Sequence, residues 1–258
     1  MLYLLYALLD AWLIRPPEAG RVAWLREADY AHRGLHGPED APENSPAAFA
    51  AAIAQGFGIE CDVQRTSDGQ AVVFHDFDLD RLTAESGALI DRSAAQLGQI
   101  VLNGTSDGIP TLQSLLKQIG GHVPLLIEVK SRKGLRVVPL CLAVRRVLEG
   151  YCGPVAVMSF DPRVSRWFAT HSRHVVHGLV VSERDKSRFM RALRTRITLW
   201  AARPEFVAWD VRDLPSKLAA KQRKRGLPLL TWTVRDDRLR QRAERYADAL
   251  IAEGEGIA

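Results

Sequence analysis

The stretch YAHRGLHGPEDAPENSPAAF, residues 30–49, combines a short apolar run, a histidine, an arginine, a loop and the start of a helix. The loop is rich in glycine, proline and acidic residues, and an alanine-rich segment follows it. This order is typical of a buried strand that ends in a loop and leads into a helix. It raises the question of why His32 and Arg33 stand where the strand gives way to the loop.

The same succession of a β-rich run and a helix-like segment recurs along the chain. The eight runs are ADYAHRG (28–34), FGIECDV (57–63), HVPLLIEVK (122–130), PVAVMSF (154–160), VVHGLVV (175–181), EFVAWDV (205–211), LPLLTWTV (227–234) and ADALIA (247–252). Strands that alternate with helices over about 250 residues predict an α/β fold, a (β/α)₈ TIM barrel. We expect one domain over residues 1–258, because no linker divides the chain.

A further β-like run, AVVFHD (71–76), breaks this alternation. Only QRTSDGQ (64–70) separates it from the second strand, which leaves no room for a helix. The pair Asp68-Gly69 indicates a tight hairpin turn, and a turn centred on that pair would set His75 opposite Asp62. Residues 77–121 then form the longest connection before the third strand, and we expect them to be a small insertion over the catalytic face of the barrel.

Composition and charge favour an ordinary globular protein. The net charge of +5 comes largely from SRFMRALRTR (187–196) and KLAAKQRKRG (217–226), runs that usually form solvated helix faces, so we expect no nucleic-acid partner. The three cysteines stand at scattered spacings without the pairs of a disulfide framework or a zinc site, which favours a cytoplasmic location. The oligomeric state cannot be predicted from the sequence.

The amino-terminal segment MLYLLYALLDAWLIRPP (1–17) is strongly apolar, but Asp10 interrupts it and Pro16 and Pro17 end it. It is therefore shorter than the roughly 20 residues that span a bilayer. It also lacks the basic start and the small-residue cleavage site of a secretory signal. Two interpretations remain: a helix packed against the domain or a partner subunit, or an interfacial anchor that gives peripheral membrane contact through residues 1–14.

Polar residues follow or end several of the predicted strands, at the carboxyl ends where a parallel barrel has its active site. They are His32 and Arg33 on the first strand, Glu60 and Asp62 on the second, His75 and Asp76 on the hairpin, and Glu128 and Lys130 on the third.

The acidic members of this set predict a metal site. Glu60 and Asp62 are two residues apart on a strand, so their side chains share a face, and Glu128 comes from another strand. Three carboxylates that converge inside a barrel repel one another unless a cation lies among them. Ligation by oxygen alone favours one Mg²⁺ or Ca²⁺ ion over zinc. The alternative is that these acids form buried salt bridges with Arg33 and Lys130.

The histidines predict acid–base chemistry. His32 and His75 arrive from separate strands, and two imidazoles that face each other across a substrate can remove one proton and donate another, although a single strand histidine is equally well explained as a core residue. Arg33 and Lys130 beside a divalent cation concentrate positive charge, which suits a phosphate diester. His32 and Arg33 would then stand at the barrel rim in order to meet a phosphate.

These residues resemble the glycerophosphodiester phosphodiesterase family. The matching motifs run in order over about residues 29–253: HRG (32–34), PENS (42–45), ECD (60–62), DG (68–69), HD (75–76) and EVK (128–130), with looser matches in MSFDP (158–162) and WTV (232–234). The resemblance implies a TIM barrel with a divalent metal on Glu60, Asp62 and Glu128, acid–base catalysis by His32 and His75, and phosphate contacts from Arg33 and Lys130.

The reaction that the resemblance implies is the hydrolysis of glycerophosphodiesters to sn-glycerol 3-phosphate and an alcohol. In such enzymes the neighbouring glycerol hydroxyl attacks phosphorus and expels the head-group alcohol, and water then opens the cyclic phosphate. The resemblance gives Glu43 and Asn44 a supporting role in the metal shell or the first loop. We further predict that Phe160 and Trp232, at the ends of the fourth and seventh strands, line the pocket, the alternative being that both belong to the core.

Two positions depart from the family pattern. Ser45 replaces a threonine and keeps a hydroxyl that can cap a helix. The segment IAEGEG (251–256) stands where an aspartate and a proline usually follow the last strand, so no role is predicted for Glu253. Two other functions remain open: a lysophospholipase D, favoured by the apolar amino terminus, and a non-catalytic barrel that binds phosphorylated ligands.

Overall fold

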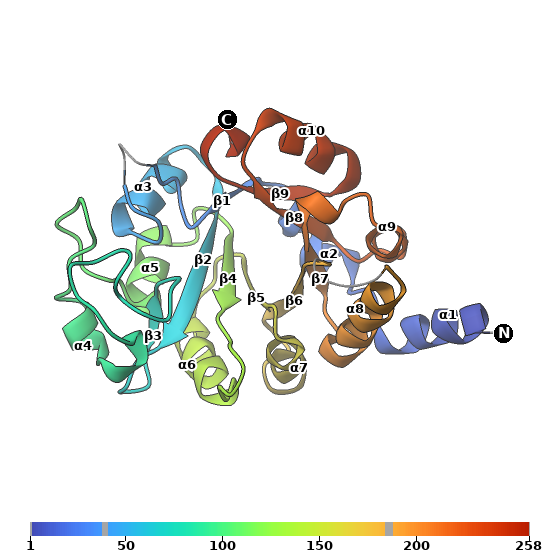
Figure 1. Cartoon of the computed structure of the whole chain (residues 1–258), viewed down its shortest axis with the longest axis horizontal. Helices are drawn as coiled ribbons and strands as arrows, with labels where there is room; N and C mark the ends of the chain where they lie inside the picture. Colours follow the sequence, from blue (N-terminus) through green and yellow to red (C-terminus); the bar gives the residue numbers. More distant parts are fainter. Residues whose placement is uncertain (1, 38–40, 184–187, 258) are drawn as a thin grey trace.

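Eight parallel strands close into a barrel in the computed structural model, which describes residues 2–37, 41–183 and 188–257 (Figure 1). The strands are β1 (Tyr30–His32), β2 (Gly58–Arg65), β4 (Leu125–Val129), β5 (Val155–Ser159), β6 (Val176–Val181), β7 (Phe206–Asp210), β8 (Leu229–Val234) and β9 (Ala249–Ala252). They pair in the order β1-β9-β8-β7-β6-β5-β4-β2, and the pairing of β1 with β2 closes the sheet. The predicted TIM barrel is confirmed.

Helices surround the barrel and connect its strands (Figure 1). They are α1 (Leu2–Leu13), α2 (Ala19–Val22), α3 (Pro46–Ala54), α4 (Ala94–Leu97), α5 (Leu112–Ile119), α6 (Val138–Leu148), α7 (Pro162–His171), α8 (Arg188–Ala202), α9 (Lys217–Lys224) and α10 (Asp237–Tyr246), with 3₁₀ turns at Ala23–Arg26, Leu89–Asp91, Val211–Asp213 and Gly254–Ile257. The predicted cap at Ser45 is present, because its hydroxyl accepts a hydrogen bond from the Ala48 amide at 3.1 Å and so begins α3.

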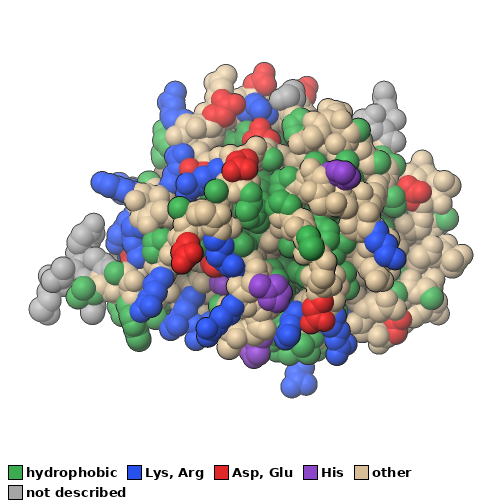
Figure 2. All heavy atoms as spheres, turned by 180° about the vertical axis from the view of Figure 1, so that it is seen from behind, with side chains coloured by type: hydrophobic (Ala, Val, Ile, Leu, Met, Phe, Trp, Pro, Cys, Tyr) green, Lys and Arg blue, Asp and Glu red, His purple; other side chains and the backbone are tan. Residues whose placement is uncertain are grey.

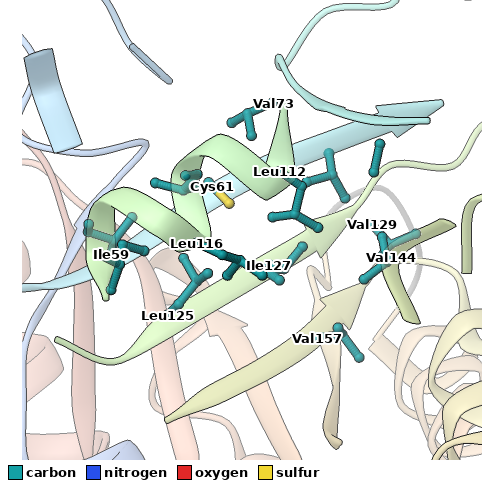
Figure 3. Packing of buried hydrophobic residues seen from close by; sticks show 14 of the residues in the cluster. Ile59, Cys61, Val73, Leu112, Leu116, Leu125, Ile127, Val129, Val144 and Val157 are labelled. Carbon is teal, nitrogen blue, oxygen red and sulfur yellow. The ribbon is translucent and has the colours of Figure 1, made fainter. Parts of the chain in front are cut away.

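Alternation along the strands divides the buried residues between two layers. Outward-facing side chains such as Ile59, Cys61 and Ile127 pack against the helices, as Figure 3 shows for the region around β2, β4 and α5. Inward-facing side chains from several strands pack with Leu25 and Tyr30 in a separate cluster. The polar residues of β2 lie on this inward face, so the pleat that builds the core also aims Glu60 and Asp62 into the barrel.

The hairpin after β2 exists, but its register differs from the predicted one. β3 (Ala71–Val73) pairs antiparallel with β2, with Val63 opposite Val73. The turn contains one residue more than expected: the Gly69 amide donates to the Thr66 carbonyl at 3.1 Å, and Gly69 itself has a φ of 83°, a conformation that glycine adopts at little cost. The amide of Phe74 therefore bonds to the Asp62 carbonyl, and the expectation that His75 lies opposite Asp62 is wrong.

Residues 77–121 contain α4, α5 and the 3₁₀ turn Leu89–Asp91. Apolar side chains of this segment, including Leu79, Leu89 and Leu97, pack with Val72 and Phe74 of the hairpin in a small cluster of their own. α5 then lies against α3, β3 and α6. The segment is thus anchored to the hairpin and places the backbone that follows His75.

The amino-terminal helix α1 packs on α8 through a buried polar contact. Asp10 is completely buried, where it accepts a hydrogen bond from Trp200 Nε1 at 2.9 Å and pairs with Lys221 Nζ at 2.7 Å. Leu8 and Trp12 of the same helix are 61% and 63% exposed. Within the described part of the chain, no helix combines the length and the apolar character required to cross a membrane.

Charged groups of both signs lie among apolar and uncharged areas on the side of the molecule opposite to that in Figure 1. Lys and Arg side chains are numerous there, and Asp and Glu side chains lie among them (Figure 2). The last turn of α9 is also basic, with Lys221, Arg223 and Lys224. Arg223 itself pairs with Asp248 at 2.8 Å, so part of this basic charge is compensated within the chain.

Candidate active site

Three carboxylates converge inside the barrel. The pairing of β2 with β4 sets Asp62 beside Glu128, and Glu60 lies two residues earlier on β2. One oxygen from each of these three side chains lies within 4.8 Å of the others. The predicted cluster is therefore present, and its donor set of three oxygen atoms suits a hard divalent cation.

Burial and mutual repulsion shift the acidity of this cluster. Burial raises the pKa of Glu60 well above its ordinary value, and the charges of Asp62 and Glu128 raise it further. Burial also raises the pKa of Glu128, although Lys130 opposes the shift. Burial disfavours the ionised form of Asp62 as well, but the nearby cations outweigh it and lower the pKa of Asp62 to about 2.

Two cationic side chains lie against these acids. Lys130 Nζ is 3.0 Å from Glu128 Oε1 and 3.2 Å from Asp62 Oδ1. Arg33 Nε is 3.2 Å from Asp62 Oδ2, and the opposite side of its guanidinium bonds Glu43 at 2.7 Å. The salt bridges that the sequence offered as an alternative to a metal site thus exist alongside the carboxylate cluster.

The loop after β1 orients this part of the site. Arg33 and Asn44 both have a φ of 58°, a left-handed conformation that non-glycine residues rarely adopt. The Arg33 amide donates to Glu60 Oε2 at 3.2 Å. Asn44 makes two hydrogen bonds with Asp62: its Nδ2 donates to Oδ2 at 3.0 Å, and its Oδ1 accepts from the Asp62 amide at 3.2 Å. Asn44 therefore fixes the position of the Asp62 carboxylate.

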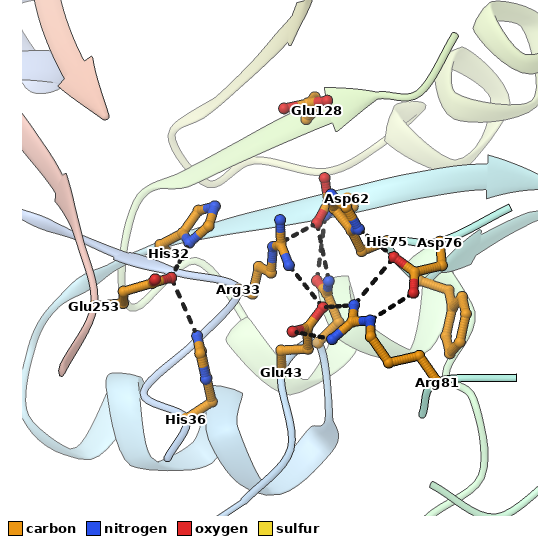
Figure 4. Close-up of polar contacts among 12 residues, drawn as sticks. His32, Arg33, His36, Glu43, Asp62, His75, Asp76, Arg81, Glu128 and Glu253 are labelled. Atoms are coloured by element: carbon orange, nitrogen blue, oxygen red, sulfur yellow. Dashed lines mark hydrogen bonds and ion pairs between the residues drawn. The ribbon is translucent and has the colours of Figure 1, made fainter. Parts of the chain in front are cut away.

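His32 lies on one side of the carboxylate cluster and is held by Glu253 (Figure 4). Its Nδ1 is hydrogen-bonded to Glu253, and its Nε2 lies 3.9 Å from Glu60 Oε2. Burial lowers the pKa of His32, an effect that Glu253 partly offsets. Glu253 also lies 3.6 Å from His36 Nε2 and bonds Arg235 at 2.5 Å, so its own position is fixed from three directions.

His75 approaches from the hairpin and is held in a similar way (Figure 4). Its Nδ1 lies 2.5 Å from Asp76 Oδ1, and Asp76 in turn accepts from Arg81 Nε at 2.6 Å. Arg81 also bonds Glu43 at 2.7 Å, which links the insertion to the Glu43–Arg33 pair. The His75 charge lowers the pKa of Asp62, as expected of a side chain near the cluster.

The two predicted aromatic residues lie together rather than against the carboxylates. The rings of Phe160 and Trp232 meet edge to face with centroids 5.2 Å apart. Trp232 is half-buried, packs against the inward-facing apolar cluster, and donates from Nε1 to the Ala208 carbonyl at 3.0 Å. Phe160 is 46% exposed. Neither the pocket-lining interpretation nor the core interpretation fits both residues, because Trp232 belongs in part to the core while Phe160 remains accessible.

The structure adds residues to which the sequence assigned no role. Glu253 was set aside because it departs from the family pattern, although it immediately follows the last strand, where a barrel directs functional side chains. Arg81 lies within the insertion, and only the fold brings it to Asp76 and Glu43. A charged residue directly after a barrel strand can be predicted from the sequence to lie at the active site, whereas an arginine within a long loop cannot.

Comparisons with known proteins agree with this geometry. The sequence profile of the glycerophosphoryl diester phosphodiesterase family matches residues 32–253. A glycerophosphodiester phosphodiesterase from Caldanaerobacter subterraneus is 27% identical over 236 residues, which are 86% of this chain and 92% of that protein. A Bacillus subtilis relative is 40% identical over 108 residues, and mouse glycerophosphodiester phosphodiesterase 1 is 38% identical over 142 residues. The matches span only 44% and 42% of those two proteins.

Solved structures show the same fold. An Oleispira antarctica phosphodiesterase, in complex with the product sn-glycerol-3-phosphate, superimposes with a TM-score of 0.73 at 24% identity and covers 86% of this chain and 91% of that one. A Thermotoga maritima glycerophosphodiester phosphodiesterase gives a TM-score of 0.70 at 22% identity, with coverage of 87% and 94%. Because the family profile extends from His32 to Glu253 and so includes every polar residue of the site, the chain belongs to the glycerophosphoryl diester phosphodiesterase family, a family of phosphoric diester hydrolases.

Proposed function

We propose that the protein is a metal-dependent phosphodiesterase that hydrolyses glycerophosphodiesters to sn-glycerol 3-phosphate and an alcohol. One observation carries this proposal: two histidines, each held through Nδ1 by a carboxylate, approach a cluster of three carboxylates and two cations. A barrel that only binds phosphate would require the cations, but it would not require two imidazoles that are oriented by carboxylates. Family membership supports the same reaction.

The carboxylate cluster fits a divalent metal. Glu60, Asp62 and Glu128 offer hard oxygen donors. Burial, and after it the charges of Asp62 and Glu128, raises the pKa of Glu60, and a bound cation would favour its ionised form. These three residues would hold one Mg²⁺ or Ca²⁺ ion. When bound, such an ion would neutralise charge on the phosphate oxygens and make phosphorus easier to attack.

The chain's own residues supply binding and proton transfer. Arg33 and Lys130 carry the positive charge that would bind the phosphate oxygens, because their guanidinium and ammonium groups lie beside Asp62. If the Nδ1–H of each imidazole donates to its carboxylate, both Nε2 atoms are free to exchange protons. One histidine then removes the proton of the attacking glycerol hydroxyl, and the other protonates the leaving alcohol.

Of the two predicted aromatic residues, Phe160 is the more accessible to a substrate. Its ring is 46% exposed at the end of β5 and meets the half-buried Trp232 edge to face. Phe160 would pack on the hydrocarbon part of the diester, and Trp232 would act mainly by fixing that ring.

Lysophospholipase D activity is the second candidate, and exposed Leu8 and Trp12 on α1 are the feature that favours it, through membrane contact by residues 1–14. However, α1 attaches through Asp10 to Trp200, near the carboxyl end of α8. In a parallel barrel the helices run back from the catalytic face, so this attachment lies away from the active-site mouth. A lipid surface held by α1 would not face the site, which supports the water-soluble diester.

A reducing, cytoplasmic location is part of the same proposal. Cys61, Cys141 and Cys152 are all unpaired, and Cys152 is exposed. An exposed free thiol is better suited to a compartment that keeps thiols reduced.

The direct test is turnover of glycerophosphocholine and of lysophosphatidylcholine by metal-stripped protein before and after metal is added. We expect no turnover after EDTA treatment, recovery with Mg²⁺ or Ca²⁺, glycerol 3-phosphate as the product, and preference for the diester without an acyl chain. Glu60→Ala, Asp62→Ala and Glu128→Ala should each weaken metal binding measured by calorimetry. Full activity in stripped protein would disprove the metal requirement, and no turnover of any diester with either metal would restore the non-catalytic interpretation.

A further inference from the structure

A cavity of about 350 Å³ opens beside Lys130, between the end of β2, the insertion and the loop that leads into α6. Apolar side chains such as Phe77 line part of its wall. The cationic side chains that line it are Arg65, Lys130, Arg132 and Arg136, and no Asp or Glu is among its lining residues in the described part of the chain. We call it the basic cavity.

The positive charge of the basic cavity is largely uncompensated. The Arg132 guanidinium lies over the Phe77 ring, 4.7 Å from its centroid. Among the described residues, no carboxylate lies within 4.0 Å of the guanidinium groups of Arg65, Arg132 or Arg136. Lys130 is paired with Asp62 and Glu128, but a cavity lined by three arginines without a carboxylate partner attracts an anion.

The first turn of α6 adds to this preference. Val137 precedes the helix without a side-chain cap, and Pro139 is its second residue. The backbone amides of an uncapped helix start carry partial positive charge, and Val137 and Pro139 both line the basic cavity. The helix start therefore reinforces the charge of the arginines.

The basic cavity is directly connected to the proposed reaction centre. Lys130 lines it, and Lys130 Nζ is 3.0 Å from Glu128 and 3.2 Å from Asp62. A more open cavity of about 780 Å³ lies on the His75 side and shares Phe77, Lys130 and Arg132, but its lining mixes three acids, Asp76, Asp78 and Asp80, with a further cation, Arg81. The two compartments beside the phosphate site thus differ in charge.

We propose that the basic cavity is the head-group subsite and that it selects diesters whose alcohol carries a negatively charged group of its own, a phosphate monoester or a carboxylate. This inference rests on the proposed diesterase function. The apolar walls would contact the hydrocarbon part of the alcohol, and the arginines would pair with its terminal anion. A cationic alcohol would be repelled.

Three diesters that share the glycerophosphate half test this directly: glycerophosphoglycerol with a terminal phosphate, glycerophosphoglycerol, and glycerophosphoethanolamine. We expect kcat/KM to fall in that order, with about tenfold between the first two, equivalent to a few partly exposed ion pairs. The preference should shrink between 0.05 and 0.5 M NaCl, because salt screens exposed charges (Debye length about 10 Å at 0.1 M). A fourth diester, with a carboxylate in place of the terminal phosphate, shows which of the two anionic groups the basic cavity prefers.

Variants identify the subsite. Arg132→Gln and Arg136→Gln, alone and together, should reduce the ratio of kcat/KM on the phosphorylated diester to that on glycerophosphoglycerol toward one. Arg238→Gln on α10, an exposed arginine outside the cavity, is the matched control and should retain the ratio.

A ratio near one in the wild type, or an unchanged ratio in the double variant, would overturn the inference and leave the diesterase function intact. Preference for glycerophosphoethanolamine would overturn it in favour of the acid-lined cavity. Absence of turnover on all diesters would instead disprove the function itself.

Discussion

Each of the two histidines of the site is held at Nδ1 by one carboxylate, and the two carboxylates come from very different places in the chain. Glu253 holds His32 from the strand end 221 residues later, whereas Asp76 holds its direct neighbour His75. A carboxylate at Nδ1 selects the tautomer with Nε2 free and stabilises the imidazolium that forms during the reaction. Glu253 is therefore a positioning residue for His32 in the proposed mechanism.

At this scale we predict the effect of removing each group. His32→Ala and His75→Ala should each lose about 10²–10⁴ in kcat, because each exchanges a proton in the proposed reaction. Glu253→Gln, which keeps the length of the side chain but not its charge, should lose about 10–100-fold in kcat while KM changes little. Steady-state kinetics on a glycerophosphodiester measures all three.

A leaving group that needs no proton separates the roles of the histidines. A p-nitrophenyl diester should partly rescue the variant that lacks the general acid, but not the variant that lacks the base. Glu253→Gln should follow the behaviour of His32→Ala on this substrate, since it acts through that histidine. Near-normal turnover in both alanine variants would return the histidines to a structural role.

At the scale of elements, α7 begins at a side-chain cap that directly follows a strand end. Asp161 directly follows the end of β5 and Phe160, and its carboxylate accepts from the Arg163 amide at 2.9 Å and from Ser131 Oγ at 2.8 Å. The cap thus starts α7 and also ties the loop after β4 to the loop after β5. Burial raises the pKa of Asp161, but the bonds from Arg163 and Ser131 prevail and lower it.

Asp161→Ala should lower the free energy of unfolding by about 1 kcal/mol at pH 7, the usual value of a helix cap. Because the folded pKa is lower than the ordinary value of about 3.9, the charge stabilises the fold above that value, and this contribution is lost as the pH falls through the folded pKa. Urea unfolding measures this: the free energy of unfolding of Asp161→Ala should differ from that of the wild type by less at pH 3 than at pH 7. Asp161→Asn retains a capping oxygen and is the control; equal loss in both variants would assign the effect to charge alone.

At the scale of the whole molecule, α1 is attached through a buried acid, Asp10, and through the Tyr6 ring, whose centroid lies 4.9 Å from the Arg196 guanidinium. Asp10 accepts from Trp200 and pairs with Lys221, and Arg196 Nε lies 3.3 Å from it. Arg225 donates to the Asp10 carbonyl at 2.8 Å. These contacts support the proposal that residues 1–258 form one domain, with α1 as a packed helix whose outer face remains apolar.

Asp10→Asn should destabilise the protein by about 1–3 kcal/mol, because the bond from Trp200 can persist while the charge that faces Lys221 and Arg196 is lost. Thermal unfolding monitored by circular dichroism measures the change. Leu8→Gln on the exposed face is the control and should shift stability by less than about 0.5 kcal/mol. If Asp10→Asn unfolds at the wild-type temperature, α1 is not held by these contacts.

Local pattern determined much of this protein. The β-rich runs that alternate with helix-like segments predict eight strands, and the Asp68-Gly69 pair predicts a hairpin; the parallel barrel and the antiparallel pairing of β2 with β3 confirm them. Glu60 and Asp62 share a face because strand geometry requires it, and residues that end barrel strands must meet at one rim. The convergence of Glu60, Asp62 and Glu128 could be predicted for this reason, without knowledge of any long-range contact.

The tertiary structure decided what depends on turn length, loop path and relative placement. One additional residue in the turn at Gly69 shifts the hairpin register, which the Asp-Gly pair alone does not specify. The contact of Glu253 with His32 requires the barrel to close, since only closure brings β9 beside β1. The path of the insertion sets Arg81 against Asp76, and the packing of α1 on α8 buries Asp10. Such contacts join segments whose separation in the sequence carries no periodic signal, so they arise only when the whole chain has packed.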